Sequence, residues 1–198
     1  MRSLRGHEIT GRVAEAPPRS QARLTGVVYL FYFLVAILAE FLVGRGLVAY
    51  GNTVNVVAFA IYIAVTVLFY HMFKPVNRRL SLLAALFSIV GCAIGSLSVF
   101  HLAPLHISAF LFFGPYCLLI GYLILRSTFL PRIFGVLMVF AGLGWLLFLL
   151  PSLANDLANA IEALGILAEG SLMLWLLVLG VNEQRWSEQA NRPDSAAF

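Results

Sequence analysis

Residues 159–181 read NAIEALGILAEGSLMLWLLVLGV, an apolar run with the carboxylate of Glu169 near its middle. About 20 apolar residues in a helix are enough to cross the hydrocarbon core of a membrane. A carboxylate at the centre of such a helix costs about 2.5–3.5 kcal/mol even on lenient insertion scales. We therefore expect Glu169 to face other protein groups or a wet cavity rather than lipid.

The composition of the whole chain is typical of a membrane protein. Of its 198 residues, 61% are apolar and only 11% are charged, whereas soluble domains hold about 45–50% and about 25%. Basic residues are scattered singly between apolar runs, which argues against nucleic acid as a partner. Cys92 and Cys117 both lie inside apolar runs, and we expect two small core residues with no disulfide.

Five further apolar runs precede residues 159–181, so the sequence predicts an all-α, polytopic bundle of six transmembrane helices embedded in a lipid bilayer. The predicted spans cover about residues 24–44, 53–73, 80–103, 105–125, 133–150 and 159–181. They form a membrane domain over residues 23–182, between a flexible N-terminal tail (1–22) and a C-terminal tail (183–198). We expect the first helix to stay uncleaved, because no clear small-residue cleavage site ends it.

The distribution of positive charge predicts the orientation. Twelve of the 13 Lys and Arg residues fall in the two tails and in the second and fourth loops, and only Arg45 lies on the other side. Positively charged loops stay in the cytoplasm. The bias therefore places both termini inside and requires an even number of spans.

With this orientation, every acidic residue outside the tails lies in the outer half of the membrane. Glu40 falls in the outer leaflet and Glu169 near the midplane. This asymmetry predicts an outward-facing polar pocket floored by Glu169. Two simpler interpretations stay open: Glu40 pairs with Arg45 at the interface, or Glu169 is a hydrogen-bonding contact between helices.

Further polar candidates on the outer side are Asn55, His101 and His106. A metal site would need a third ligand brought across the bundle to the two histidines, and nothing in the spacing requires one. We expect no metal and no cofactor. The chain also lacks the glycine-rich, nucleophile-elbow and zinc-binding motifs of soluble enzymes.

Small residues indicate where helices approach one another closely. Gly91 and Gly95 form a G-x-x-x-G pattern in the third span, and such residues let helix backbones come together. The pattern predicts either a homo-oligomer seam or close packing inside the bundle.

Several phrases occur together in the order of a known family. They are Arg23-Leu-Thr-Gly26, Lys74-Pro-Val-Asn77, Gly121-Tyr-Leu-Ile124, Phe129-Leu-Pro-Arg-Ile-Phe-Gly135, Ala141-Gly-Leu-Gly144 and Glu169-Gly-Ser-Leu-Met-Leu-Trp-Leu-Leu177. Over residues 22–182 the chain resembles the uncharacterised bacterial membrane family named domain of unknown function 4386. The resemblance implies a multi-helix protein of the bacterial inner membrane and includes Glu169 in a family motif. It implies no activity.

The leading functional hypothesis is a protein that binds a hydrophobic, lipid- or isoprenoid-like small molecule. Glu40 and Glu169 are its candidate proton donors and acceptors, because a neutral glutamic acid can donate a proton in a dry site. The remaining candidate ligand-binding residues are the aromatic side chains of Tyr29, Tyr32, Trp145 and Trp175 together with Arg45, Asn55, His101 and His106. Aromatic faces can stabilise positive charge, as cyclase- or isomerase-like chemistry would require. The alternatives are a non-enzymatic accessory subunit and a proton-coupled small-solute transporter.

Overall fold

The structure is a computed structural model that describes residues 17–102 and 108–192, with the backbone alone for residues 151–155. Within these ranges the chain forms seven helices and no strand. The helices are α1 (Pro18–Gly44), α2 (Val48–Phe73), α3 (Arg78–Val99), α4 (Phe110–Arg126), α5 (Arg132–Leu147), α6 (Pro151–Val178) and α7 (Glu183–Ala190). Each predicted span overlaps one of α1–α6, with bounds that differ by up to eight residues. Residues 103 and 105–107 of the third and fourth predicted spans lie outside the described residues. Helix α1 begins before the predicted start of its span, so residues 18–22 are helical, and α7 occupies part of the predicted C-terminal tail.

Local sequence signals set several of the helix ends. Pro18 and Pro151 occupy first helical positions, where the missing N–H of proline is not needed. Asn77 caps α3 because its side chain accepts a hydrogen bond from the backbone N–H of Leu80 at 2.9 Å. After α1, Gly46 takes a positive φ of 82°, which turns the chain sharply into α2.

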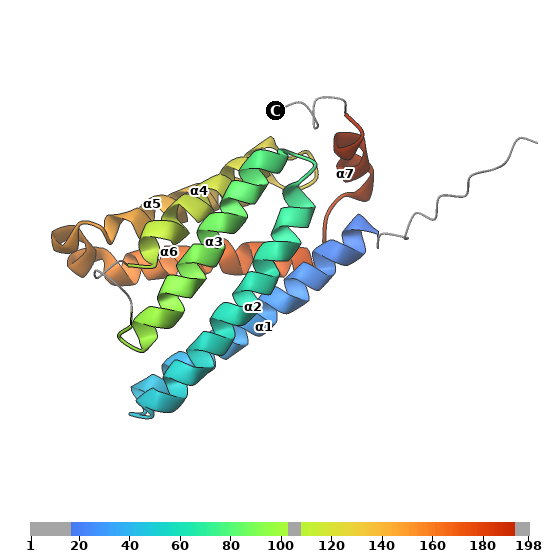
Figure 1. Ribbon diagram of the computed structural model, residues 1–198. Coiled ribbons are helices and arrows are strands. Elements are labelled where there is room, and N and C mark those ends of the chain that lie inside the picture. The colour runs from blue at the N-terminus through green and yellow to red at the C-terminus, as the bar shows by residue number, and fades with distance from the viewer. Residues whose placement is uncertain (1–16, 103–107, 193–198) are drawn as a thin grey trace, which may run out of the picture.

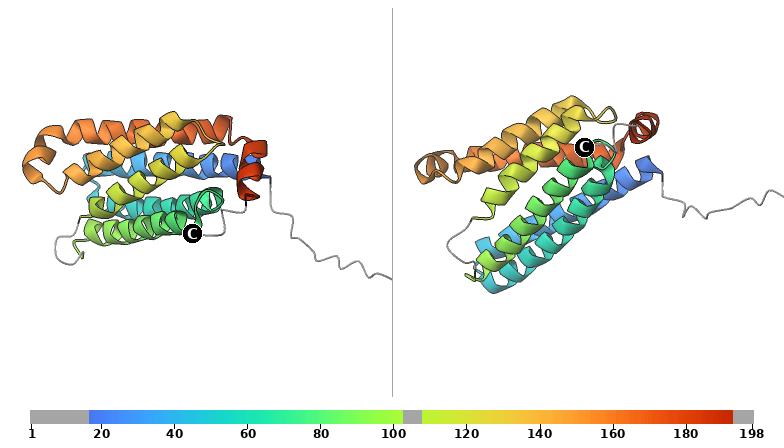
Figure 2. Two further views of the ribbon diagram at one scale, coloured as in Figure 1. Left: turned by 90° about the horizontal axis from the view of Figure 1, so that it is seen from above. Right: turned by 45° about the horizontal axis from the view of Figure 1, so that its top comes forward.

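The helices form a closed ring. Each of α1–α6 packs against the next along the chain, and α6 packs against α1. In Figure 1, α1 and α6 lie close together at the end of the bundle that carries α7, which we name the α7 end, and they diverge toward the opposite, far end. Figure 2 shows α7 lying across the ends of the longer helices.

Glycines allow the closest approaches within the ring. A Cβ atom added to Gly121 of α4 would lie 2.8 Å from the carbonyl oxygen of Gly135 in α5, and one on Gly142 would lie 2.8 Å from that of Gly114. On α1, a Cβ on Gly26 would collide with the backbone of α6 at Leu177. These contacts bring whole helix backbones together, as small residues do in membrane bundles.

The G-x-x-x-G pattern of α3 packs inside the chain. Gly91 and Gly95 are both buried. A Cβ on Gly91 would lie 3.2 Å from the ring of Phe113, and one on Gly95 would lie 2.5 Å from the ring of Phe59. Both glycines therefore allow close packing within the bundle, and a homo-oligomer through them stays a prediction.

The exterior of the bundle is apolar. On α1 alone, Phe31, Leu34 and Ile37 are more than half exposed, a surface that suits lipid far better than water. Among the described helices, α1, α2, α3 and α6 are long and apolar enough to cross a membrane, while α4 and α5 are shorter apolar helices of 17 and 16 residues. The fold is all-helical, as predicted, and its apolar helices support a membrane-embedded protein.

Candidate functional site

Glu169 lies on the inward face of α6 and is 9% exposed. Its Oε2 atom accepts a hydrogen bond from the hydroxyl of Tyr29 at 2.6 Å and a longer one from the hydroxyl of Tyr62 at 3.4 Å. The thiol of Cys117 approaches Oε1 at 3.9 Å. The carboxyl group is thus contacted from α1, α2 and α4, and we name these four residues the Glu169 cluster.

The sequence brings these groups together through helix periodicity and close packing. On α6, Ala168, Leu172 and Leu176 are fully buried and share the inward face with Glu169, as the three- and four-residue spacings of a helix require. Gly26 lets α1 approach α6 closely. Tyr29 lies about one turn further along α1, from where its long side chain reaches the carboxyl group.

Aromatic rings surround the cluster. Tyr32 packs edge-to-face on Tyr62 with ring centroids 4.7 Å apart, and Tyr29 packs on Tyr62 at 5.9 Å. Tyr116 also packs edge-to-face on Tyr62, with ring centroids 5.9 Å apart. Edge-to-face pairs of this kind are favourable beyond the area that they bury, so the rings hold the phenol groups in place around Glu169.

The hydroxyl of Tyr116 is the exception in this core. The side chain is fully buried, and the hydroxyl makes no hydrogen bond to any residue that the structure describes. Tyr62 is a polar neighbour, but the two hydroxyl groups do not meet hydrogen-bond geometry. A buried polar group without a partner costs roughly 1–3 kcal/mol, and such groups often mark a place for water or a ligand.

The cluster is electrostatically simple. Its hydrogen-bond donors are two phenols and a thiol, and within the described part of the chain no Lys, Arg or His donates to Glu169. A buried carboxyl group must be neutral or well hydrogen-bonded. The arrangement can therefore hold a proton on Glu169, pass it to a group beside it, or accept one from that group.

A pair of hydroxyl groups extends this polar core toward α3. The side chains of Thr66 and Ser88 are hydrogen-bonded at 2.6 Å, and Thr66 also donates to the carbonyl oxygen of Tyr62 at 2.9 Å. Every buried hydroxyl of this pair has a partner. The Thr66–Ser88 bond fixes α2 against α3 one turn from Tyr62.

The structure brings only some of the predicted site residues together. Tyr29 contacts Glu169, and Tyr32 packs on Tyr29 with ring centroids 6.0 Å apart. Glu40 is exposed and lies about three turns, or about 16 Å, beyond Tyr29 along α1. Arg45 is also exposed, with its guanidinium 4.9 Å from the ring centroid of Phe41.

The other predicted ligand-binding residues lie away from the cluster. Trp145 stacks on Phe110 toward the far end, with ring centroids 5.0 Å apart, and Trp175 packs on Phe134 toward the α7 end. Asn55 is half-buried on α2, and His101 is exposed after α3 with a φ of 57°. His106 lies outside the described residues.

Two pockets lie at the α7 end. One, of about 410 Å³, is lined by residues that include Arg19, Trp175 and Glu183. The second, of about 510 Å³, is lined by residues that include Arg132, Arg185 and Arg192. The outward-facing polar pocket expected from the sequence stays a prediction, and the residues that the structure describes hold no group of three or more metal-ligating side chains.

Sequence reasoning missed Tyr62 and Tyr116, and it read Cys117 only as a core residue. A usable signal was present, because all three lie well inside apolar runs, where a hydroxyl or thiol group needs a partner from another helix. What the sequence does not state is which face of its helix each residue occupies.

Fold and site together define a class: a helical membrane protein with a carboxyl group held by phenols in its core. The chain belongs to the family described as Domain of unknown function (DUF4386), which matches residues 44–109 and 105–180. The resemblance inferred from the sequence is therefore confirmed. The matched segments include Tyr62, Cys117 and Glu169, while Tyr29 precedes them.

A relative from the archaeon Archaeoglobus fulgidus is similar to part of the chain. This uncharacterized protein is 29% identical over 91 residues, which are 43% of this chain and 56% of the relative. The chain thus spans just over half the length of that protein. No solved structure matches the chain.

Proposed function

We propose that the protein spans the bacterial inner membrane six times, with both termini in the cytoplasm. Support comes from the coincidence of α1–α6 with six apolar runs and from the concentration of 12 of the 13 basic residues on one side. Helices α4 and α5 are about 24–26 Å long at 1.5 Å per residue. With the residues that flank them, they are long enough for a hydrocarbon core of about 30 Å.

Within this bundle, the Glu169 cluster is an acid–base site that binds a hydrophobic small molecule through a polar or unsaturated group. The observation that carries this proposal is the unpartnered hydroxyl of Tyr116, buried in the same aromatic core as Glu169. A ligand group that bonds to this hydroxyl would satisfy it and would lie near the Glu169 carboxyl. Lipid- or isoprenoid-like molecules are the proposed ligands, because they can reach the bundle from the bilayer.

The chemistry of the site follows from its groups. Neutral Glu169 can give a proton to a double bond or an oxygen atom of the ligand and take one back, so that an isomerisation or cyclisation consumes no net proton. The rings of Tyr32 and Tyr62 can stabilise positive charge that develops during the transfer. Glu40 lies on nearly the same face of α1 as Tyr29 but about 16 Å beyond it, so its part in the proton transfer stays a prediction.

The alternative function is that of a non-enzymatic accessory subunit in which the cluster is structural. A specific observation favours it: Glu169 already contacts side chains from three other helices. Such a carboxyl group would hold α1, α2, α4 and α6 together without any ligand.

One experiment separates the two proposals. The wild-type protein and its Glu169→Gln, Tyr116→Phe and Tyr50→Phe variants are purified in a mild detergent, and organic extracts are analysed by mass spectrometry. Tyr50 is 69% exposed and serves as the matched control for Tyr116. A binding site predicts a retained hydrophobic compound in the wild type and the control, and a clear loss in the other two variants.

Equal retention in all four proteins, or no retained compound in any, would exclude the binding site. Folded yield decides the structural alternative. The structural alternative predicts that Glu169→Ala fails to fold, while Glu169→Gln folds normally. It also predicts that the extracts of the Glu169→Gln variant and of the wild type contain the same compounds.

A further inference from the structure

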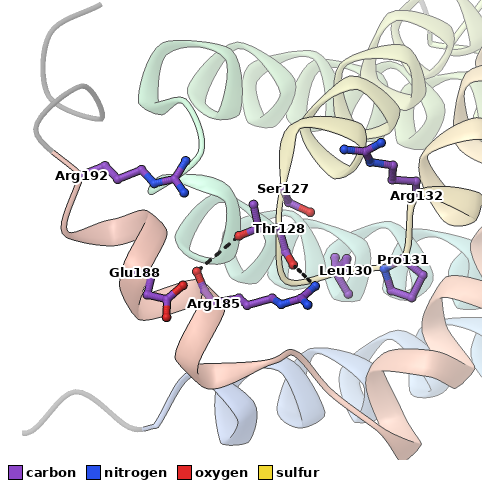
Figure 3. A pocket seen from close by; sticks show the side chains of 8 residues that line it. All are labelled: Ser127, Thr128, Leu130, Pro131, Arg132, Arg185, Glu188 and Arg192. Atoms are coloured by element: carbon purple, nitrogen blue, oxygen red, sulfur yellow. Dashed lines mark hydrogen bonds between the residues drawn. The ribbon is translucent and has the colours of Figure 1, made fainter.

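A pocket of about 510 Å³ opens at the α7 end, and its lining includes no residue of the Glu169 cluster. It lies between the turn that joins α4 to α5 and helix α7, and its lining includes Ser127, Thr128, Arg132, Arg185, Glu188 and Arg192. Figure 3 shows Arg185 and Arg192 entering from α7 and the residues after it, and Arg132 from the start of α5. Side chains from separate elements thus meet around one space.

The walls of this pocket are fixed by hydrogen bonds. Gln189 is buried, and its Oε1 atom accepts from the backbone N–H of Thr128 at 3.0 Å while its Nε2 atom donates to the carbonyl oxygen of Arg126 at 3.3 Å. Trp186 donates its indole N–H to the carbonyl oxygen of Met72 at 3.1 Å. Helix α7 is therefore held against the bundle from two sides, and the pocket does not depend on a single contact.

The charge of the lining is positive. It carries three guanidinium groups and the carboxylate of Glu188, which leaves a net charge of about two positive units near neutral pH. Arg185 donates to the carbonyl oxygen of Thr128 at 3.4 Å, which orients its side chain along the turn. Arg132 begins α5, and no side chain among the described residues caps that helix start, so the helix dipole adds to the positive potential.

We propose that this pocket binds a phosphate group, carried either by an anionic lipid headgroup or by a free phosphate ion. Guanidinium groups match phosphate in geometry and charge and can bind it through paired N–H donors. The pocket lies at the ends of apolar helices, the level at which headgroup phosphates occur, and basic pockets between helices there bind anionic lipids. The proposal does not depend on the role of Glu169.

The experiment is a titration of the full-length protein in mild detergent, followed by native mass spectrometry. The probes are phosphatidylglycerol and, separately, inorganic phosphate. The test variant combines Arg132→Gln with Arg192→Gln, and Arg132→Gln alone serves as a milder second variant. The matched control combines Arg78→Gln with Arg79→Gln, which removes two exposed charges at the same end of the bundle.

We expect the test variant to bind its probe at least about tenfold more weakly than the wild type, since each charge-assisted hydrogen bond lost accounts for about that factor. The single variant should fall between the two, and the control should match the wild type. Binding of phosphatidylglycerol alone identifies a lipid headgroup as the source, and binding of both probes identifies a general phosphate site. Failure of the wild type to bind either probe, or an equal loss of binding in the control, overturns the proposal.

Discussion

Tyr29 and Tyr116 carry the same phenol group into the same core, but their hydroxyl groups meet different surroundings. The Tyr29 hydroxyl donates to Glu169 at 2.6 Å, whereas the Tyr116 hydroxyl has no partner among the described residues. Both side chains are fully buried. A Tyr→Phe substitution therefore removes a stabilising hydrogen bond at position 29 and an unpaired polar group at position 116.

We predict different effects of Tyr29→Phe and Tyr116→Phe on the free energy of unfolding. The first should lower the free energy of unfolding by about 1–2 kcal/mol, because Glu169 loses its shortest hydrogen bond. The second should leave it unchanged or raise it by up to about 1 kcal/mol in protein stripped of lipid. Chemical unfolding in detergent micelles measures both, and equal losses in the two variants would contradict the assignment of their hydroxyl groups.

Among the helices, α7 is short and polar, and it depends on its contacts with the turn after α4. Gln189 makes several of these contacts, since its one side chain bonds both Thr128 and Arg126. Gln184 on the same helix is exposed, and among the described residues its side chain bonds only Glu188 on its own helix. The two glutamines therefore form a matched pair.

We predict that Gln189→Ala loosens α7 while Gln184→Ala does not. The part-buried hydrogen bond from the backbone N–H of Thr128 would lose its acceptor, at a cost of about 0.5–1.5 kcal/mol. Hydrogen exchange of residues 183–190 should become faster in Gln189→Ala alone. Unchanged exchange in that variant would show that α7 is held by other contacts.

The contact between α4 and α5 makes a second prediction at the level of elements. Alanine at Gly121 would place a Cβ atom 2.8 Å from the backbone of Gly135, which cannot move without shifting the whole helix. We expect Gly121→Ala to lower the free energy of unfolding by about 1–3 kcal/mol. Gly44→Ala is the control, because a Cβ atom there meets nothing within 4 Å. The free energy of unfolding of this variant should equal or exceed that of the wild type. A Gly121→Ala protein as stable as this control would rule out the close approach.

For the whole molecule, the distribution of charge predicts that both ends of the chain lie on the same side of the membrane. Fusions of a cytoplasmic fluorescent reporter and a periplasmic phosphatase to each terminus test this directly. We expect fluorescence and no phosphatase activity at both ends. Reporters that place the two termini on opposite sides would require an odd number of spans.

The positions of the helices could be predicted from the sequence because the length of an apolar run is a local property. The face that each helix turns inward could not. In a membrane the exterior is as apolar as the core, so on α2 the exposed Val57 and Val67 resemble the buried Val65. Periodicity therefore gave no reason to choose Tyr62 as a partner of Glu169.

The candidate site could likewise be predicted only in part: the costly residue could be found, but its partners could not. Glu169 was found because a carboxylate at that depth is costly wherever it points. Depth also drew attention to Glu40, but the contact between two residues depends on the crossing of their helices. Helices α1 and α6 diverge toward the end of α1 that follows Tyr29 (Figure 1). The angle at which two apolar helices cross cannot be predicted from their apolar residues alone.

A double-mutant cycle between Tyr29 and Glu169 tests the central claim most directly, namely that the carboxyl group and the phenol act as one unit. Tyr29→Phe and Glu169→Leu are measured singly and together by chemical unfolding, with Tyr50→Phe in place of Tyr29→Phe as the control cycle. We predict that the combined loss falls short of the sum of the single losses by about 0.5 kcal/mol or more, while the control cycle is additive. Additive losses for Tyr29 and Glu169 would contradict the account.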